Sequence, residues 1–175
     1  MKTKSIACLI AAIATVVSTG TVRAAMPAAG TAAPLFAAQD QNGHSFKLSN
    51  LIGKRVVLLY FYPKDFTGGC TKEACGYRDR MPELEKDGVQ VVGVSFDSAA
   101  SHRAFEKKYH LNFILIPDPD GRVADLYGAR MNGRNMDKRV SFLIGLDGRI
   151  MHVTDSPNPA VHFREMKEAI AALKK

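Results

Sequence analysis

The stretch from Val56 to Cys75 constrains this chain more than any other. It begins with an almost uninterrupted apolar run, Val56 to Tyr62, which is typical of a strand buried on both faces of a sheet. A turn containing proline and glycine follows, and then a helix begins in which Cys70 and Cys75 stand five positions apart. The start of a helix offers free backbone N–H groups and the positive end of the helix dipole, so a thiol placed there is favoured as thiolate. Of the two cysteines, Cys70 is better placed to act as a nucleophile.

The spacing of the two cysteines predicts a conformational change. On an intact helix, Cα atoms five residues apart are separated by about 8–9 Å. A disulfide requires roughly 4.4–6.8 Å. Cys70 and Cys75 can therefore bond only if the first helical turn unwinds, and Gly68, Gly69 and Gly76 weaken the helix on both sides. The alternative is that both cysteines are buried and act only as small hydrophobic residues.

The residues around Cys70 resemble a known family. Pro63, Thr67 and Cys70 form the pattern Pro-x-x-x-Thr-x-x-Cys, which is similar to the peroxidatic motif of the peroxiredoxins. The continuation Cys-Thr-Lys-Glu-Ala-Cys resembles the atypical two-cysteine Q type, also called bacterioferritin comigratory proteins. The resemblance runs from about Ala33 to the C-terminus. It implies a thiol-dependent peroxidase in which Cys70 is peroxidatic and forms a sulfenic acid, and Cys75 is resolving and closes an intramolecular disulfide.

Four further residues are candidates for the same site. The Thr67 hydroxyl, three residues before Cys70, can accept a hydrogen bond from a helix-start N–H and offer its proton to the thiolate or the peroxide, or it is an ordinary N-cap. Pro63 shapes the loop and shields the thiolate from water. Arg139 opens the segment Arg-Val-Ser-Phe-Leu-Ile, which resembles the family segment whose arginine lies beside the peroxidatic cysteine and polarises the peroxide. Without that resemblance it reads as a surface charge. Glu73 either orients Arg139 or only complements the helix dipole.

The remaining pattern alternates strands and helices, which predicts an α/β, thioredoxin-like sandwich with a central mixed sheet flanked by helices. The resemblance implies the same fold. The helix that carries Cys70 is expected to reach about Lys86, with Pro82 as a kink or break. The other expected elements are a hairpin within Phe36–Leu48, a strand over Val89–Phe96, a helix from Ser98 to Tyr109, a strand over Phe113–Ile116, a helical turn at Val123–Tyr127, a hairpin formed by Arg139–Leu146 and Arg149–Val153, and a helix over Pro159–Leu173.

The chain of 175 residues is long enough for one domain. We assign residues 35–175 to that domain and residues 25–34, rich in alanine and proline, to a flexible lead-in. Residues 1–24 are typical of a signal peptide, with Lys2 and Lys4 before the apolar stretch Ile6 to Val17 and small residues before a cleavage point after Ala24. An uncleaved membrane anchor is the alternative. We therefore expect an exported protein, located in the periplasm of a bacterium with two membranes.

The composition narrows the list of partners. The net charge is +7, but no basic run with interleaved aromatic residues occurs, so nucleic-acid binding is not expected. The histidines are not at ligand spacing and the cysteines are not in a Cys-x-x-Cys motif, so neither a metal nor another cofactor is expected. The resemblance implies a hydroperoxide substrate and a thioredoxin-like dithiol reductant. We expect a monomer without stable membrane association after cleavage. An exported copper-handling protein and a dithiol–disulfide exchange protein on the same fold are the competing hypotheses.

Overall fold

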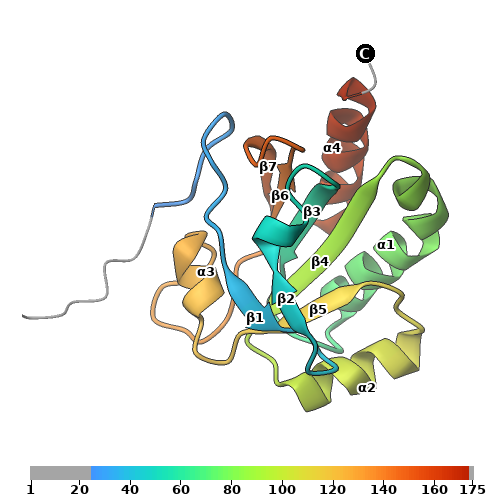
Figure 1. Ribbon diagram of the computed structural model, residues 1–175. Helices are drawn as coiled ribbons and strands as arrows, with labels where there is room; N and C mark the ends of the chain where they lie inside the picture. The colour runs from blue at the N-terminus through green and yellow to red at the C-terminus, as the bar shows by residue number, and fades with distance from the viewer. Residues whose placement is uncertain (1–24, 174–175) are drawn as a thin grey trace, which may run out of the picture.

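The computed structural model describes residues 25–173 of the chain; the predicted signal peptide, residues 1–24, lies outside the described residues. The described part contains a two-stranded hairpin and a five-stranded sheet with strand order β5-β4-β3-β6-β7 (Figure 1). The elements are β1 (Ala37–Gln39), β2 (Ser45–Lys47), the 3-10 helix η1 (Leu48–Asn50), β3 (Val56–Phe61), α1 (Gly68–Lys86), β4 (Val89–Ser95), α2 (Ala99–Tyr109), β5 (Ile114–Pro117), α3 (Arg122–Leu126), β6 (Val140–Ile144), β7 (Ile150–Asp155) and α4 (Pro159–Ala172).

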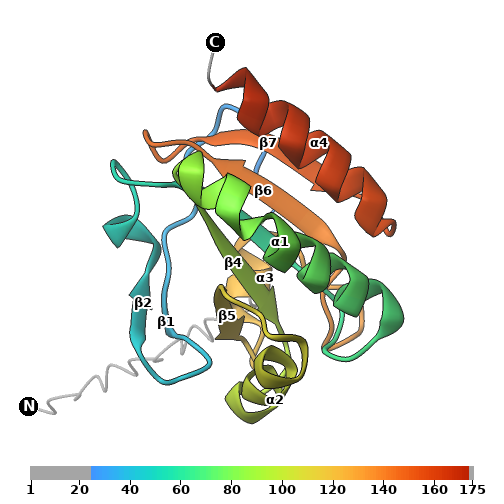
Figure 2. The ribbon, with the colours of Figure 1, turned by 90° about the vertical axis from the view of Figure 1, so that its right-hand side faces the viewer.

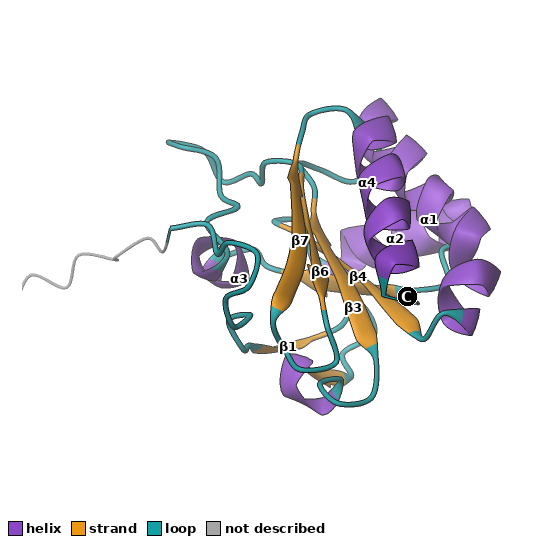
Figure 3. Ribbon diagram, turned by 90° about the horizontal axis from the view of Figure 1, so that it is seen from above, coloured by secondary structure: helices purple, strands orange, loops and turns teal. Residues whose placement is uncertain are grey.

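The sheet lies between two layers. Helices α1, α2 and α4 cover one face and α3 covers the other (Figure 3). Side chains alternate along a strand, so β3 sends Leu58 and Tyr60 into the core beneath α1, and Leu59 and Phe61 into the core beneath α3 and the β1–β2 hairpin. All six residues of β3 are buried, as its apolar run predicted. The predicted mixed sheet flanked by helices is confirmed.

Strand direction determines which loops meet. Strands β3, β4 and β5 are parallel and are joined through α1 and α2. Strand β6 runs antiparallel to β3, with Val140 opposite Phe61. The start of β6 therefore lies beside the end of β3, where the loop toward Cys70 begins.

Helix α1 ends at Lys86, as predicted. It begins at Gly68 and continues through Pro82, so of the kink or break expected at that proline the break does not occur. A proline inside a helix removes one hydrogen bond. Met81 and Leu84, on either side of it, are buried in the core and hold the helix in place. None of the helices in residues 25–173 has both the length and the hydropathy that a bilayer crossing needs.

The segment expected to be a flexible lead-in is also different. The Gly30 N–H donates to the Ile150 carbonyl at 2.7 Å, and the Ile150 N–H donates to the Thr31 carbonyl at 2.9 Å. The Ala33 N–H donates to the Gly148 carbonyl at 2.9 Å. The expectation of a flexible segment over residues 25–34 is wrong for this stretch, because its backbone pairs with the start of β7.

Helices α1 and α4 lie side by side on the sheet and touch at a glycine (Figure 2). A Cβ atom built on Gly76 would collide with the ring of Phe163. The Tyr77 ring meets the Phe163 ring edge-on with centroids 5.1 Å apart, and the Arg80 guanidinium lies 4.7 Å from the Phe163 centroid. The close packing of the two helices therefore requires glycine at position 76.

This contact gives a prediction for stability. Gly76→Ala should lower the free energy of unfolding by about 1–3 kcal/mol through overpacking, although alanine favours a helix by up to about 1 kcal/mol. In a Phe163→Ala background the same substitution should be stabilising, since the collision is gone. Urea unfolding of the four proteins measures both effects. A stabilising Gly76→Ala in both backgrounds would contradict this account of the contact.

Candidate active site

Cys70 is placed by the junction of β3 and α1. It is the third residue of α1, and its side chain is almost completely buried, at 1% exposure. The Thr67 carbonyl accepts the first helical hydrogen bond, from the Thr71 N–H at 2.8 Å. Cys70 therefore lies within the first turn, where the helix dipole is positive and favours an anion.

Arg139 approaches Cys70 from the start of β6, the strand that pairs with β3. It directly precedes β6, and the register of β6 on β3 brings it beside the loop that leads to Cys70. Its Nη2 lies 3.3 Å from the Cys70 Sγ, and its Nε donates to the Pro157 carbonyl at 3.2 Å. The structure thus brings together two residues that are 69 positions apart in the sequence.

Glu73 completes this group. Its Oε2 accepts a hydrogen bond from Arg139 Nη1, so the guanidinium lies between the carboxyl group and the Cys70 sulfur. Glu73 is fully buried, and burial raises the pKa of its carboxyl to about 7, against the opposing effect of Arg139. The other oxygen, Oε1, has no hydrogen-bond partner among the described residues. Of the two interpretations of Glu73, the geometry favours contact with Arg139.

Thr67 and Pro63 lie differently from what their motif suggested. The Thr67 side chain is exposed, caps no helical N–H, and donates its hydroxyl proton to the Lys64 carbonyl at 3.0 Å. The expected hydrogen bond from a helix-start N–H is absent because the hydroxyl turns back toward the loop. Pro63 is half-buried and lines a cavity of about 190 Å³ whose lining does not include Cys70.

Cys75 lies five residues after Cys70 on the same helix. It is partly exposed, and both thiols are free. Because α1 spans both positions, the helical separation of about 8–9 Å applies and is too long for a disulfide.

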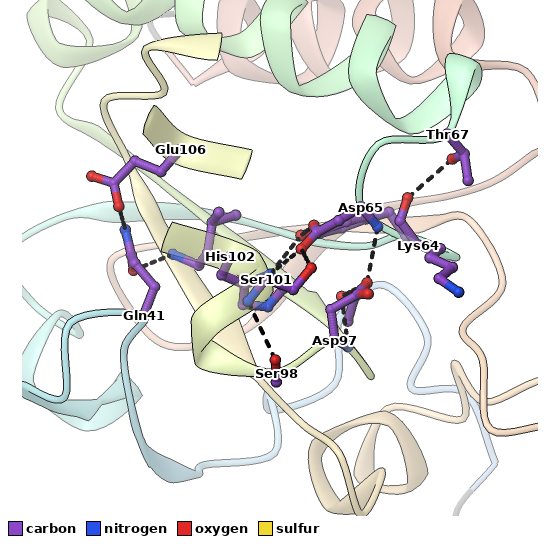
Figure 4. A network of polar contacts seen from close by, with 12 residues as sticks. Gln41, Lys64, Asp65, Thr67, Asp97, Ser98, Ser101, His102 and Glu106 are labelled. Carbon is purple, nitrogen blue, oxygen red and sulfur yellow. Dashed lines mark hydrogen bonds and ion pairs between the residues drawn. The ribbon is translucent and has the colours of Figure 1, made fainter. Parts of the chain in front are cut away.

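A buried carboxylate that sequence reasoning missed anchors the loop before Cys70. Asp65 reads as a solvated charge in the sequence, yet it is buried, and Figure 4 shows it beside Ser101 and His102. It accepts hydrogen bonds from Tyr62 Oη at 2.8 Å, Ser101 Oγ at 2.7 Å and His102 Nδ1 at 2.9 Å. Burial acts to raise the pKa of Asp65, but the hydrogen bonds from His102 and its neighbours outweigh this and hold the pKa below its ordinary value. Two of these three partners, Ser101 and His102, lie on α2, more than thirty positions away, so the sequence next to Asp65 did not reveal its burial.

The next residue holds the outer side of the same loop. Phe66 adopts a φ of 61°, which is unusual for a bulky side chain. Its ring meets that of Phe105 edge-on at a centroid distance of 5.1 Å, and it lies 6.3 Å from the Tyr109 ring. Consecutive residues thus fix the loop to α2, Asp65 from inside and Phe66 from outside.

The raised pKa of Glu73 predicts how stability depends on pH. The ordinary pKa of a glutamate is 4.5, and that of folded Glu73 is about 7, so between these values the folded state binds more protons than the unfolded state. Stability of the wild type should fall as the pH rises through this window. The stability of Glu73→Gln relative to the wild type should therefore rise by up to about 3 kcal/mol from pH 4.5 to 7 and then level off.

Urea unfolding at a series of pH values measures this difference. Glu83→Gln, at an exposed position of the same helix, is the matched control. If the stability of Glu73→Gln relative to the wild type stays constant or falls as the pH rises, burial does not hold the carboxyl of Glu73 protonated.

Comparison with known proteins places this site in a family. Residues 29–153 match the AhpC/TSA family. The chain is 44% identical over 140 residues to "Peroxiredoxin Bcp" of Escherichia coli (strain K12), an alignment that covers 77% of this chain and 89% of that protein. It is 37% identical over 152 residues to "Peroxiredoxin Q, chloroplastic" of Oryza sativa subsp. japonica, covering 82% of this chain and 67% of that protein.

Solved structures agree with the sequence relatives. Peroxidoxin BcpB from Mycobacterium tuberculosis superposes with a TM-score of 0.80 at 30% identity, covering 86% of this chain and 100% of that chain. The bacterioferritin comigratory protein of Xanthomonas campestris superposes with a TM-score of 0.73 at 28% identity, covering 80% and 92%. The predicted thioredoxin-like peroxiredoxin fold is confirmed. The chain therefore belongs to the AhpC/TSA family and is a peroxiredoxin of the Bcp/Q type, a thiol-dependent peroxidase that uses a peroxide and a thiol reductant.

Proposed function

We propose that this protein reduces hydrogen peroxide and organic hydroperoxides through Cys70. The Cys70 thiolate attacks one peroxide oxygen, the O–O bond breaks, and water or an alcohol leaves while Cys70 becomes a sulfenic acid. The observation that carries the proposal is the Arg139 Nη2 at 3.3 Å from the buried Cys70 Sγ at the start of α1. A positive charge at that distance stabilises both the thiolate and the negative charge that develops on the leaving oxygen.

The other site residues support this step. Glu73 holds the guanidinium in the orientation that directs Nη2 at the sulfur. Pro63 stiffens the loop between β3 and α1. Thr67 is our proposed contact to the peroxide, made when its hydroxyl rotates away from the Lys64 carbonyl.

We propose that Cys75 then condenses with the Cys70 sulfenic acid, which forms a disulfide and releases water. The sulfur of Cys70 must leave its buried place for this, and the first turn of α1 must unwind. Two features confine the unwinding. Asp65 and Phe66 hold the loop before α1 against α2, and Phe163 packs on Gly76 just after Cys75. The segment from Gly68 to Cys75 is left to rearrange.

The resulting disulfide requires a dithiol to return to the reduced form. We propose a thioredoxin-like protein, because exchange with a dithiol restores both cysteines without another cofactor. The features of residues 1–24 support export to the periplasm, and there the donor is supplied by a relay across the membrane instead of by cytosolic thioredoxin. We also propose that the enzyme acts as a monomer, since both cysteines of the cycle lie on one helix.

Copper handling and dithiol–disulfide exchange remain the competing functions, and no specific contact in residues 25–173 favours either of them. Copper titration and insulin disulfide reduction distinguish them from peroxide reduction.

The two cysteines give the direct test of the cycle. One equivalent of peroxide added to the reduced protein should remove two hydrogens from its intact mass and cross-link Cys70 with Cys75 in the peptide map. Cys70→Ser should abolish peroxide consumption. Cys75→Ser should react once and then over-oxidise. Steady-state peroxidase activity in Cys70→Ser would exclude this function for Cys70.

Substitutions of the two glycines before Cys70 distinguish unwinding of the first helical turn from the reaction with peroxide. A Cβ on Gly68 meets nothing within 4 Å, so Gly68→Ala should only strengthen the first turn by up to about 1 kcal/mol and slow disulfide formation by up to about fivefold. A Cβ on Gly69 would lie 3.1 Å from Arg139 Nη2, so Gly69→Ala should slow sulfenic acid formation as well. Quenched-flow mass spectrometry resolves the two steps. Equal effects of both substitutions on the peroxide step would contradict the role of Arg139.

A further inference from the structure

We infer that His162, the fourth residue of α4, is a positioning residue that holds Arg139 against Cys70. This inference rests on the proposed function, since the position of Arg139 matters for turnover only if Cys70 is the reacting thiol. His162 is completely buried, and its hydrogen bonds join it to Ser141 and Ser156 and not to Cys70. It acts through the turn between β7 and α4.

The first arm of this action runs through two consecutive residues of that turn. His162 Nε2 lies 2.8 Å from the Ser156 carbonyl oxygen, which can only accept, so Nε2 carries a proton. The next carbonyl, that of Pro157, accepts the hydrogen bond from Arg139 Nε at 3.2 Å. The Ser156 N–H in turn donates to the Arg139 carbonyl at 3.3 Å. Residues 156 and 157 thus hold both the backbone and the side chain of Arg139, and His162 holds residue 156.

The second arm fixes the ring to the strand that follows Arg139. With its proton on Nε2, the neutral ring has a lone pair on Nδ1, which accepts a hydrogen bond from Ser141 Oγ at 2.7 Å. Ser141 follows Arg139 by two residues, and alternation along β6 directs both side chains to the α1–α4 side. The imidazole therefore bridges β6 and the turn, on either side of the arginine.

The charges around the ring agree with a neutral imidazole. The ionisable groups that face it are Glu73 on α1, with Oε1 at 3.8 Å from Nδ1, Arg139 before β6, Asp155 at the end of β7, and Glu165 on α4 itself. Burial lowers the pKa of His162 and the nearby Arg139 lowers it further, and together they outweigh the hydrogen bond to Ser156 and the charges of Glu165 and Asp155, which raise it. A neutral ring places no second positive charge near Glu73, so the carboxyl group remains available to Arg139.

Two substitutions separate the two arms. His162→Gln places an amide nitrogen near the position of Nε2 and keeps the donor to Ser156. His162→Asn places an amide oxygen near Nδ1, keeps the acceptor for Ser141 and does not reach Ser156. If His162 acts through the turn, the Asn variant should lose about 10- to 100-fold in the rate constant of Cys70 with hydrogen peroxide, while the Gln variant retains most of it. His152→Asn, a histidine that contacts Glu165 instead, is the matched control.

The decisive measurement repeats His162→Asn in an Arg139→Ala background. The pre-reduced full chain is mixed with excess hydrogen peroxide, and loss of the free Cys70 thiol is followed by mass spectrometry. If His162 acts through Arg139, His162→Asn should cause no further loss of rate once Arg139→Ala has removed the guanidinium. Two results would overturn the inference. One is an equal loss of rate in His162→Gln and His162→Asn, and the other is a loss of rate for His162→Asn that is as large in the Arg139→Ala background as in the wild type.

A second measurement needs no variant. Nitrogen NMR of the histidine rings in the wild type should find His162 neutral, with its proton on Nε2, at neutral pH. A protonated ring or the Nδ1–H tautomer would also overturn the inference. Failure of the proposed function is a separate outcome, because the wild type itself would then not react with peroxide at Cys70.

Discussion

The pairing of β6 with β3 is the interaction on which the active site depends. Because the two strands are antiparallel, the residue that precedes β6 meets the residues that follow β3. A slip of one residue would turn the Arg139 side chain to the opposite face of the sheet, away from α1. Both strands are buried on both faces, so such a slip would also put core side chains out of register. The apolar core therefore fixes the geometry of the polar site.

Once Arg139 is in place, its three kinds of nitrogen have three different partners. Nε binds the Pro157 carbonyl, Nη1 binds Glu73 and Nη2 contacts Cys70. Each bond restricts the conformation of the Arg139 side chain, which in the proposed reaction lowers the entropy that must be lost when a peroxide is bound and attacked. In the proposed reaction, Glu73 also competes with the Cys70 thiolate for the positive charge of Arg139. Because the pKa of Glu73 is raised to about 7, its carboxyl group gains or loses a proton near neutral pH. The strength of the competition changes with that proton.

The sequence was a good guide to what is decided locally. The buried strand before Cys70, the helix after it and the two hairpins followed from apolar runs and turn residues, and the structure contains them. The break considered at Pro82 does not occur, because core residues on both sides of it outweigh one lost hydrogen bond. The segment before residue 34 was misjudged because its partner is a strand more than a hundred positions away.

The polar side chains of the site were harder to predict, for the same reason. Arg139 came only from resemblance to a family, since nothing near it in the sequence points to Cys70. Asp65 and His162 are polar residues, and partners from other elements, Ser101 and His102 for Asp65 and Ser141 for His162, contribute to making their burial favourable. Composition and periodicity describe one segment at a time, whereas a buried polar group is explained by several segments together.

The burial of Cys70 has a consequence for what this thiol can meet. Cys70 is only 1% exposed while α1 is intact, so a small molecule can approach its sulfur more easily than a large one, whereas Cys75 is partly exposed. A bulky electrophile has to wait for the helix to open before it can reach Cys70. In the proposed cycle the enzyme would thus select its oxidants by size, and the stability of the first turn of α1 would determine how strict that selection is.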